Sequence, residues 1–418
     1  MSSAMKTAPW LCVALAAGIS SCGPKQAPSS ITDSVPDGDA LTLEVTGAPG
    51  EQAAAIPAAA DLARAVPAAA TVWPETGDDL ALAQKKISAL NSTLRAIFDH
   101  VDGVALVGGG PWPSAAGRWY GPNDRCAVDV SPCPDGDAAT FRLWLGMGVR
   151  GMGFVLEAKA IGADDSTYGA ILAGWMKQGL VARRGVGQIW VNLENLRLAA
   201  PAFPGQGYLY GGFAAGPKAK VAVYRLAGFT TDANSTDPDL APATVFFRGF
   251  KNAAGTARVR VAALRDYVHT TSDDELGLFH VVYQPALGGR AYAVVANYLS
   301  GGVTHGDVPA GDYFFGRSCY APHAPGTPLF KEWFLCPLGE APADCATSGG
   351  LDEHLVTGSS WAADCAGLAL DASTSFAAPT SAPAADPAAA PGALPGEDSS
   401  GLTPEDAPAT TDAAPTAG

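Results

Sequence analysis

The sequence predicts a mainly β fold, an antiparallel sandwich or barrel-like domain preceded by one amphipathic helix and flanked by disordered tails. Apolar residues recur at helical spacing between residues 80 and 101, and they alternate with polar residues in many short segments after residue 137. Turn signals containing glycine, proline or asparagine separate these segments, as in consecutive antiparallel strands. Residues 22–77 and 371–418 are rich in Ala, Pro, Ser and Asp and poor in aromatic residues, a composition typical of disorder.

The N-terminus predicts export. Lys6 precedes an apolar run from Pro9 to Ile19, which has the length of a secretory signal and is too short to span a bilayer. The run ends in ISSCG, residues 19–23, which resembles the lipobox of bacterial lipoproteins, with isoleucine at position 19 where leucine is commoner. The resemblance implies cleavage before Cys22, diacylation of its thiol and acylation of the new amino group.

The same resemblance implies a location in the cell envelope, with the membrane bound through lipidated Cys22. Gly23 stands where some bacteria place the aspartate that retains lipoproteins in the inner membrane. We therefore expect the outer membrane, on its periplasmic or its surface side.

These features divide the chain into four parts. Residues 1–21 are the expected signal peptide, 22–77 a disordered tether, 78–370 a β-rich domain with disulfides and an N-terminal helix, and 371–418 a disordered acidic tail. Of the net charge of −15, residues 22–80 and 371–418 contribute −7 each, and residues 81–370 only −2. A near-neutral domain without a basic stripe argues against a nucleic-acid partner.

The cysteines support an oxidising compartment. Cys12 lies in the signal and Cys22 is the lipid site, which leaves an even number in the mature chain and no C-x-x-C pair. We expect structural disulfides between near neighbours in the sequence. The expected pairs are Cys126 with Cys133, Cys319 with Cys336, and Cys345 with Cys365.

One helix opens the domain. After Asp78, a candidate N-cap, apolar residues from Leu80 to Val101 recur at spacings of three and four, and Gly103 is expected to end the helix. The apolar face fits a helix packed on its own sheet; a short coiled coil that oligomerises the protein is the alternative.

About ten or eleven strands follow. Their segments combine β-branched and aromatic residues with a period of two. A sheet of this length must close on itself or fold over as a sandwich, and a helix before it resembles, by element order alone, the half-barrel of periplasmic lipid and lipoprotein carriers. The segments are 141–145, 153–159, 188–193, 208–210, 221–225, 244–248, 258–261, 278–283, 292–297, 313–315 and 329–335.

Catalytic motifs are absent from the sequence. There is no H-E-x-x-H, G-x-S-x-G or Walker loop, so we expect a non-enzymatic protein without a metal or cofactor. Gly146 to Gly151 matches G-x-G-x-x-G, but a second strand follows where a dinucleotide site needs a helix, so we expect a hairpin or bulge.

Two groups of polar residues are candidate sites. Asp232, Asn234, Asp237 and Asp239 offer oxygen ligands for calcium, yet their spacing fits no standard calcium loop, and a solvated loop is expected. His305 with Asp307, or His269 with Asp273 and Asp274, have the residue types of a hydrolase base and its orienting group, pairs that also arise by chance.

Three functions fit this pattern. The first is a non-catalytic envelope lipoprotein whose β-rich domain binds a partner or serves as structure. The alternatives are a periplasmic carrier of a lipid or other hydrophobic ligand, and a cell-wall or polysaccharide hydrolase. Trp112, Trp119 and Tyr120 lie in a Gly/Pro-rich segment, where their rings either stack on sugars or a peptide or cover one end of the core.

Lipidation makes a direct prediction. The native protein should carry acyl groups on Cys22 and fractionate with membranes, whereas Cys22→Ser should have the mass of an unacylated chain and leave the membrane fraction. Intact mass spectrometry of both proteins tests this, and an unmodified Cys22 in the native protein would contradict the lipoprotein assignment.

Overall fold

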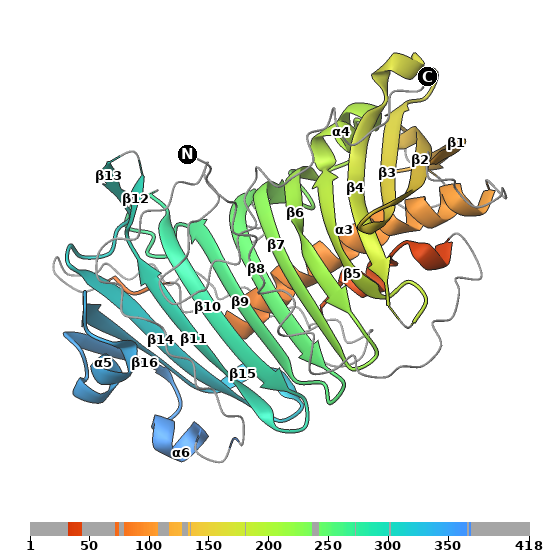
Figure 1. The fold of residues 1–418 in the computed structure, drawn as a ribbon. Coiled ribbons are helices and arrows are strands. Elements are labelled where there is room, and N and C mark those ends of the chain that lie inside the picture. The colour runs from red at the N-terminus through yellow and green to blue at the C-terminus, as the bar shows by residue number, and fades with distance from the viewer. Residues whose placement is uncertain are drawn as a thin grey trace, which may run out of the picture. The chain divides into compact units, whose positions relative to one another are not determined.

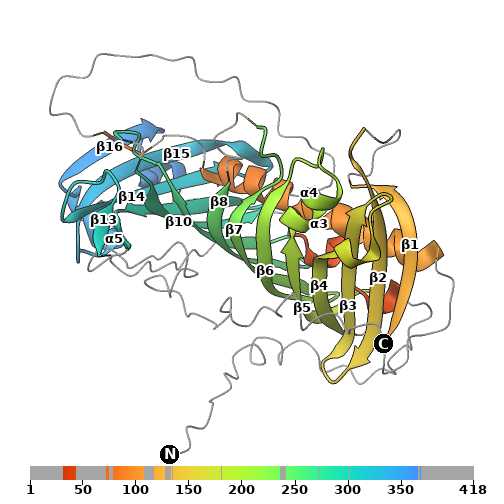
Figure 2. The ribbon, with the colours of Figure 1, turned by 90° about the horizontal axis from the view of Figure 1, so that it is seen from above.

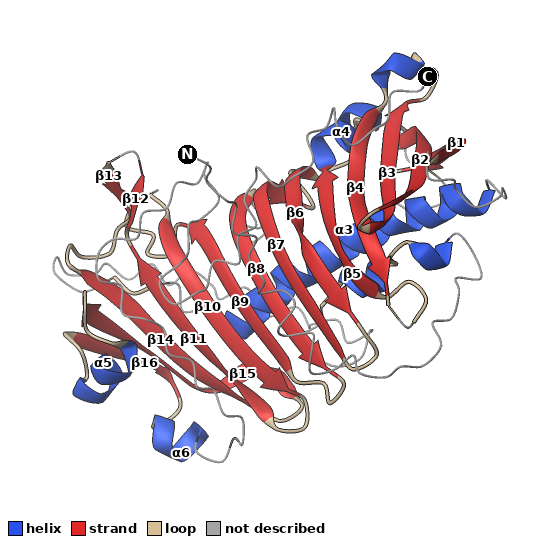
Figure 3. Cartoon of the chain, in the orientation of Figure 1, coloured by secondary structure: helices blue, strands red, loops and turns tan. Residues whose placement is uncertain are grey.

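The computed structural model describes residues 32–43, 72–74, 79–107, 117–127, 133, 135–179, 181–235, 242–271, 273–300, 302–365 and 368. They form two compact units: the first contains the described residues of 32–43 and 86–253, and the second those of 72–85 and 254–368. Strands dominate both units (Figure 3), so the mainly β prediction is confirmed. The expected signal peptide, Cys22 and the segment 371–418 lie outside the described residues.

The first unit is an antiparallel meander in which strands β1 to β8 are neighbours in sequence order (Figure 1). Helix α3 (Asp79–Val107) lies on one side of it, and the short helices are α2 (Gly38–Leu41), α4 (Leu193–Ala199) and the 3-10 turns Thr32–Ser34 and Asp165–Thr167. The strands are β1 (Arg118–Cys126), β2 (Ala138–Gly148), β3 (Gly151–Ala160), β4 (Gly169–Gln178), β5 (Gly185–Asn192), β6 (Gln206–Ala215), β7 (Ala219–Thr230) and β8 (Ala243–Asn252).

The apolar side of α3 packs on the first sheet. The ring of Phe98 meets that of Phe154 edge-on at 6.0 Å, and His100 stacks on Phe141 at 4.4 Å. Leu94 and Ile97 are buried beside them. The helix therefore packs on its own sheet, as predicted, which leaves this face unavailable for a coiled coil. Figure 2 shows α3 crossing behind the strands of this unit.

The predicted end of the helix at Gly103 is wrong. The helix continues to Val107, and Val104 and Ala105 are buried. A Cβ atom at position 103 would lie 1.5 Å from Nη1 of Arg125, so the glycine makes room for that guanidinium and does not end the helix.

Residues 32–43, expected within the disordered tether, are part of the first unit. Leu41 and Leu43 are buried, and the Asn91 side chain both donates to the carbonyl of Leu43 and accepts from its N–H, at 2.7 and 3.2 Å. The Tyr224 hydroxyl donates to the carbonyl of Leu41 at 2.9 Å. Arg184 forms an ion pair with Asp37 at 2.6 Å. Burial of these apolar side chains supplies the free energy that orders this segment.

The second unit is also antiparallel. Its strands lie in the order β9-β10-β11-β14-β15-β16, and β12 and β13 form a separate two-stranded ribbon. The strands are β9 (Ala257–Arg265), β10 (Glu275–Gln284), β11 (Gly288–Ala296), β12 (Tyr298–Ser300), β13 (Val303–His305), β14 (Asp312–Ala321), β15 (Ala324–Pro337) and β16 (Asp352–Thr357), with helices α5 (Pro342–Ser348) and α6 (Trp361–Cys365).

The six cysteines from Cys126 to Cys365 all form disulfides, but two of the three expected pairs are wrong. Cys126 pairs with Cys133 as predicted, whereas Cys319 pairs with Cys365 and Cys336 with Cys345. In the β14–β15 hairpin Cys319 faces Phe330 and Cys336 faces Tyr313, so Cys319 and Cys336 sit at opposite ends of it. The two disulfides therefore attach α6 to β14 and α5 to β15.

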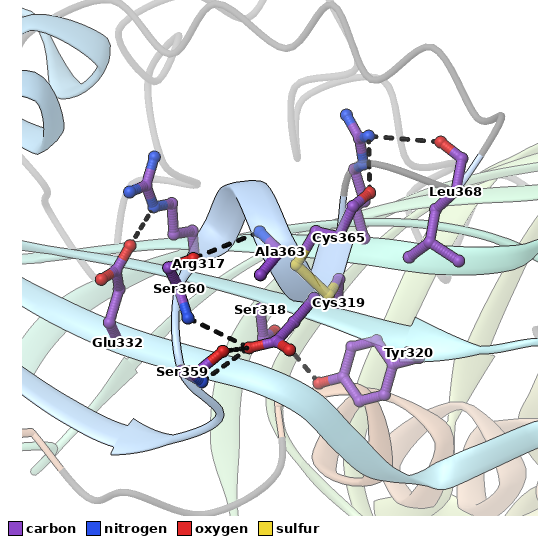
Figure 4. The surroundings of a disulfide bond; sticks show 12 residues. Arg317, Ser318, Cys319, Tyr320, Glu332, Ser359, Ser360, Ala363, Cys365 and Leu368 are labelled. Carbon is purple, nitrogen blue, oxygen red and sulfur yellow. Dashed lines mark hydrogen bonds and ion pairs between the residues drawn. A yellow bond between two sulfur atoms is a disulfide. The ribbon is translucent and has the colours of Figure 1, made fainter.

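The α6 attachment includes more than the disulfide (Figure 4). Arg290 donates from Nη2 to the carbonyls of Cys365 and Leu368 at 3.3 and 3.2 Å. The Trp361 ring meets Phe330 edge-on at 5.9 Å, and the Arg317 guanidinium lies 4.8 Å from its centroid. These contacts hold α6 against β14 and β15 of the second sheet.

The disulfides should differ in their contribution to stability. Loop-closure entropy grows with the length of the closed loop, and Cys319–Cys365 spans 46 residues against 9 for Cys336–Cys345. Replacing both cysteines of the longer pair with alanine should lower the free energy of unfolding by about 1 kcal/mol more than the same change in the shorter pair. Urea denaturation of both double variants tests this; an equal or reversed loss would contradict it.

Candidate functional site

Aromatic side chains form a band on the face of the first sheet that α3 does not cover. Trp144 pairs with Val155 across β2 and β3, and Val155 pairs with Ala173 on β4. Ala173 pairs with Trp190, which pairs with Tyr210 on β6. Directly opposed residues point to the same face, and Phe141 and Phe154, at odd spacing from this row, point to α3. We call this side of the first sheet the aromatic face.

A hollow of about 180 Å³ lies in this face, and we call it the aromatic slot. Val155, Ala173 and Gly174 on β3 and β4 form its floor, and rings on β2, β4, β5 and β6 surround them. Its lining residues are Trp144, Phe154, Val155, Ala173, Gly174, Trp175, Gln188, Ile189, Trp190 and Tyr210.

Glycines position the indole of Trp144. A Cβ atom at Gly117 or Gly146 would lie 2.4 or 2.5 Å from its ring atoms, and one at Gly153 would lie 3.3 Å away. Only residues without a Cβ let a flat ring lie this close to the backbone of neighbouring strands. The ring is therefore fixed before any ligand arrives.

Trp175 lines both the slot and a second hollow that adjoins it. Its Nε1–H donates to Oε1 of Gln188 at 3.1 Å, which fixes the orientation of the indole. The guanidinium of Arg150 lies 6.0 Å from its ring centroid.

A second hollow, of about 260 Å³, adjoins the slot and shares Trp144 and Trp175 with it. We call it the glycine groove; its other lining residues are Gly146, Met147, Gly148, Val149, Arg150, Gly151 and Gly153. It contains the G-x-G-x-x-G match, which is a hairpin as predicted: β2 ends at Gly148, and β3 begins at Gly151, its register partner. Met147 and Val149 are exposed there.

Charged groups border the aromatic face. Arg142 forms an ion pair with buried Glu157 at 2.7 Å, and its guanidinium lies 4.3 Å from the Trp119 centroid and 3.8 Å from that of Tyr168. Burial raises the pKa of the Tyr168 hydroxyl, so it remains protonated at neutral pH. This end of the face is thus a fixed stack of rings around one cation.

The composition of the slot favours binding over chemistry. Its lining residues include no His, Cys, Ser, Asp or Glu, and its polar groups are the amide of Gln188, the indole N–H groups and the tyrosine hydroxyl. Apolar pockets with a few fixed polar groups are typical of ligand sites.

The second unit contains a polar corner that includes residues weighed above as catalytic. Ligand atoms of Asp266, Glu275 and Asp307 lie within 4.8 Å of one another. Buried Glu275 accepts from the backbone N–H of Tyr267 and Val268 through Oε2 and from that of Asp307 through Oε1, at 2.6, 3.1 and 2.7 Å. The carboxylates therefore join the loop before β10 to the loop after β13.

The two weighed base-and-orienter pairs have other contacts. The imidazole Nδ1 of His269 lies 3.2 Å from Oδ1 of Asp266, and the backbone N–H of His269 donates to the same oxygen. His305 stacks on Tyr298 at 5.2 Å, while Asp307 accepts from the N–H and hydroxyl of Thr271. These contacts connect neighbouring loop segments within the corner.

The remaining predicted site residues are placed as follows. In the expected solvated loop the N–H of Asn234 donates to Asp232 Oδ1 at 2.9 Å, and Asp237 and Asp239 lie outside the described residues. Trp119 is half-buried beside Arg142, Tyr120 is buried, and Trp112 lies outside the described residues. Sequence reasoning missed the slot because β4, which contributes Trp175, was not predicted.

Comparison with known proteins gives no match, whether to a family model, a curated protein or a solved structure. Among the described residues, no helix is both long enough and apolar enough to cross a membrane.

Glu275 should be required for stability. In the native protein the two carboxylate oxygens of Glu275 accept from three backbone N–H groups. The amide of Glu275→Gln has only one acceptor oxygen, so we expect a loss of about 1–3 kcal/mol in the free energy of unfolding. Burial raises the pKa of Glu275, so the folded state favours its protonated form and its contribution falls as pH rises above the unfolded pKa.

Urea denaturation of both proteins between acid and neutral pH measures this effect. The loss should be larger at acid pH than at neutral pH. Asp273→Asn, which changes an exposed carboxylate in the same loop, serves as the control and should leave stability nearly unchanged. Equal stability of Glu275→Gln and the native protein would contradict the role given to this carboxylate.

Proposed function

We propose that this protein is a non-catalytic, membrane-anchored envelope lipoprotein that binds an extended, proline-containing peptide of a partner protein in the aromatic slot. The lipobox-like sequence at Cys22 supports the anchor. The observation that supports the binding function is the slot itself, with three tryptophans and a tyrosine around a small apolar floor.

A proline-containing peptide suits this geometry. The polyproline II helix is preformed and has no internal hydrogen bonds, and aromatic-lined grooves bind its flat pyrrolidine rings. The side-chain amide of Gln188, which Trp175 holds through its indole N–H, supplies a polar group for the peptide backbone. A sugar ring would also stack on indoles, but its many hydroxyl groups need more polar partners than the slot lining supplies.

The carrier alternative is less well supported. A half-barrel carrier keeps one face of its sheet for a hydrophobic ligand, but in the first unit α3 packs on one face through Phe98 and Phe154. The hollows on the other face are lined by aromatic rings and by the polar side chain of Gln188, rather than by aliphatic side chains alone.

Peptide binding can be measured on the full chain. The probe is a fluorescein-labelled peptide of alternating alanine and proline, followed by fluorescence anisotropy. Trp175→Ala removes one ring, and Ala173→Leu places a larger side chain at a buried position of the floor. Each should weaken binding at least about tenfold when no other ligand competes for the slot, as expected for a central contact.

Tyr208→Ala is the matched control. Tyr208 is exposed, lies on β6 two residues before Tyr210 and does not line the slot, so its loss should change affinity less than about twofold. Thermal denaturation confirms that each variant is folded. Chitohexaose is tested in parallel, and a chain that binds it but not the peptide would overturn the proposal in favour of a glycan ligand.

A further inference from the structure

The slot and the glycine groove together form an apolar surface with a cationic edge. They share Trp144 and Trp175, so a ligand can extend from the slot to the β2–β3 turn, where Met147 and Val149 are exposed. Arg150 is exposed in this turn.

Further cations lie on the same face. Lys177 is two residues beyond Trp175 on β4 and therefore points to the same side of the sheet. Arg248 pairs in register with Val223, which pairs with Gly212 opposite Gln188; it therefore lies on the same face, four strands or about 19 Å from Trp175. Both cations are exposed. The acid Glu157 is already paired with Arg142, so the edge of this surface favours an anionic ligand.

The C-terminal segment of the chain has matching chemistry. Residues 371–418 contain eight prolines, seven acidic residues and no Lys or Arg. Five of the prolines recur every fourth residue, at positions 379, 383, 387, 391 and 395, with Asp386 between them and Glu397 and Asp398 just after them. Regular prolines favour the extended conformation that an aromatic groove binds, and several equivalent prolines offer alternative registers.

The segment is long enough to reach the slot. The five prolines at positions 379–395 lie 11 to 27 residues after Leu368, and at about 3.1 Å per residue these lengths extend to roughly 34–84 Å. A globular domain of this size has a radius of gyration of about 19 Å. The later prolines of the repeat therefore extend well beyond that radius.

We propose that residues 371–418 of the same chain occupy the aromatic slot, with prolines against the indoles and acidic residues beside Arg150, Lys177 and Arg248. This inference rests on the proposed peptide-binding function and names its first ligand. Partner binding is then regulated by competition with the protein's own tail. A tethered ligand has an effective concentration of about 1 mM, so even an intrinsic Kd of about 100 μM would keep the slot mostly filled.

Site-specific photo-crosslinking tests the occupant in the full chain. p-Benzoylphenylalanine replaces exposed Val149 beside the slot, and in a matched control it replaces exposed Ile161, just beyond the opposite end of β3. Crosslinked monomers and dimers are separated and digested, and the joined peptides of each are identified by mass spectrometry. We expect Val149 to join residues 371–418 within one chain, independently of protein concentration, with a lower yield at high salt.

Two outcomes would overturn the proposal. One is a crosslink to the tail that is equally frequent from Ile161, or absent from Val149. The other is a crosslink found only between two chains, which would make a second copy the occupant.

Removal of the competitor provides a second measurement. With the five prolines from Pro379 to Pro395 changed to alanine, the alanine-proline probe should bind the full chain about tenfold more tightly, because the effective concentration of competitor falls. If the probe binds both proteins with the same affinity, the tail is not the ligand of the slot, but the proposed peptide-binding function stands. Failure of the probe to bind either protein overturns both.

Discussion

Phe98 and His100 of α3 contact Phe154 and Phe141, and the first unit depends on this packing. Side chains alternate between the two faces of a strand, so fixing the two phenylalanines against the helix sends Trp144 and Val155 to the other side. Because directly opposed residues of paired strands point to the same face, Ala173, Trp190 and Tyr210 lie on that side as well. The aromatic face is therefore a consequence of how the helix packs, and a shift of one residue in the register would bury the tryptophans against α3.

The elements with strong periodicity could be predicted from the sequence. In the helix, apolar residues recur at spacings of three and four over more than twenty residues. The eleven predicted strand segments all fall within or overlap strands. The glycine-rich hairpin was also predictable, because a strand followed it where a phosphate-binding loop needs a helix. These predictions rest on local patterns, and tertiary contacts did not override them.

The features that were missed depend on contacts distant in sequence. Strand β4 has Ile171 as its one β-branched residue, so its strand propensity is low, yet it pairs on both sides. Strand β1 contains Gly121-Pro122, normally a turn signal, which an edge strand tolerates through a register shift between Tyr120 and Asn123. Two disulfides join cysteines only seven and nine residues apart, but the expected pairs joined Cys319 to Cys336, which the β14–β15 hairpin places at its opposite ends. The slot could not be predicted without β4, although Trp190 and Tyr210 lay in predicted segments.

The ordered segment at residues 32–43 changes how the domain would be held at a membrane. If Cys22 bears the lipid, nine residues separate the anchor from the folded chain at Thr32, where the composition suggested more than fifty. From Cys22 to Thr32 the chain extends to at most about 35 Å. A lipidated form of this protein would work close to the bilayer surface, within reach of partners embedded in or lying on the same leaflet, and a partner across the periplasm would have to come to it.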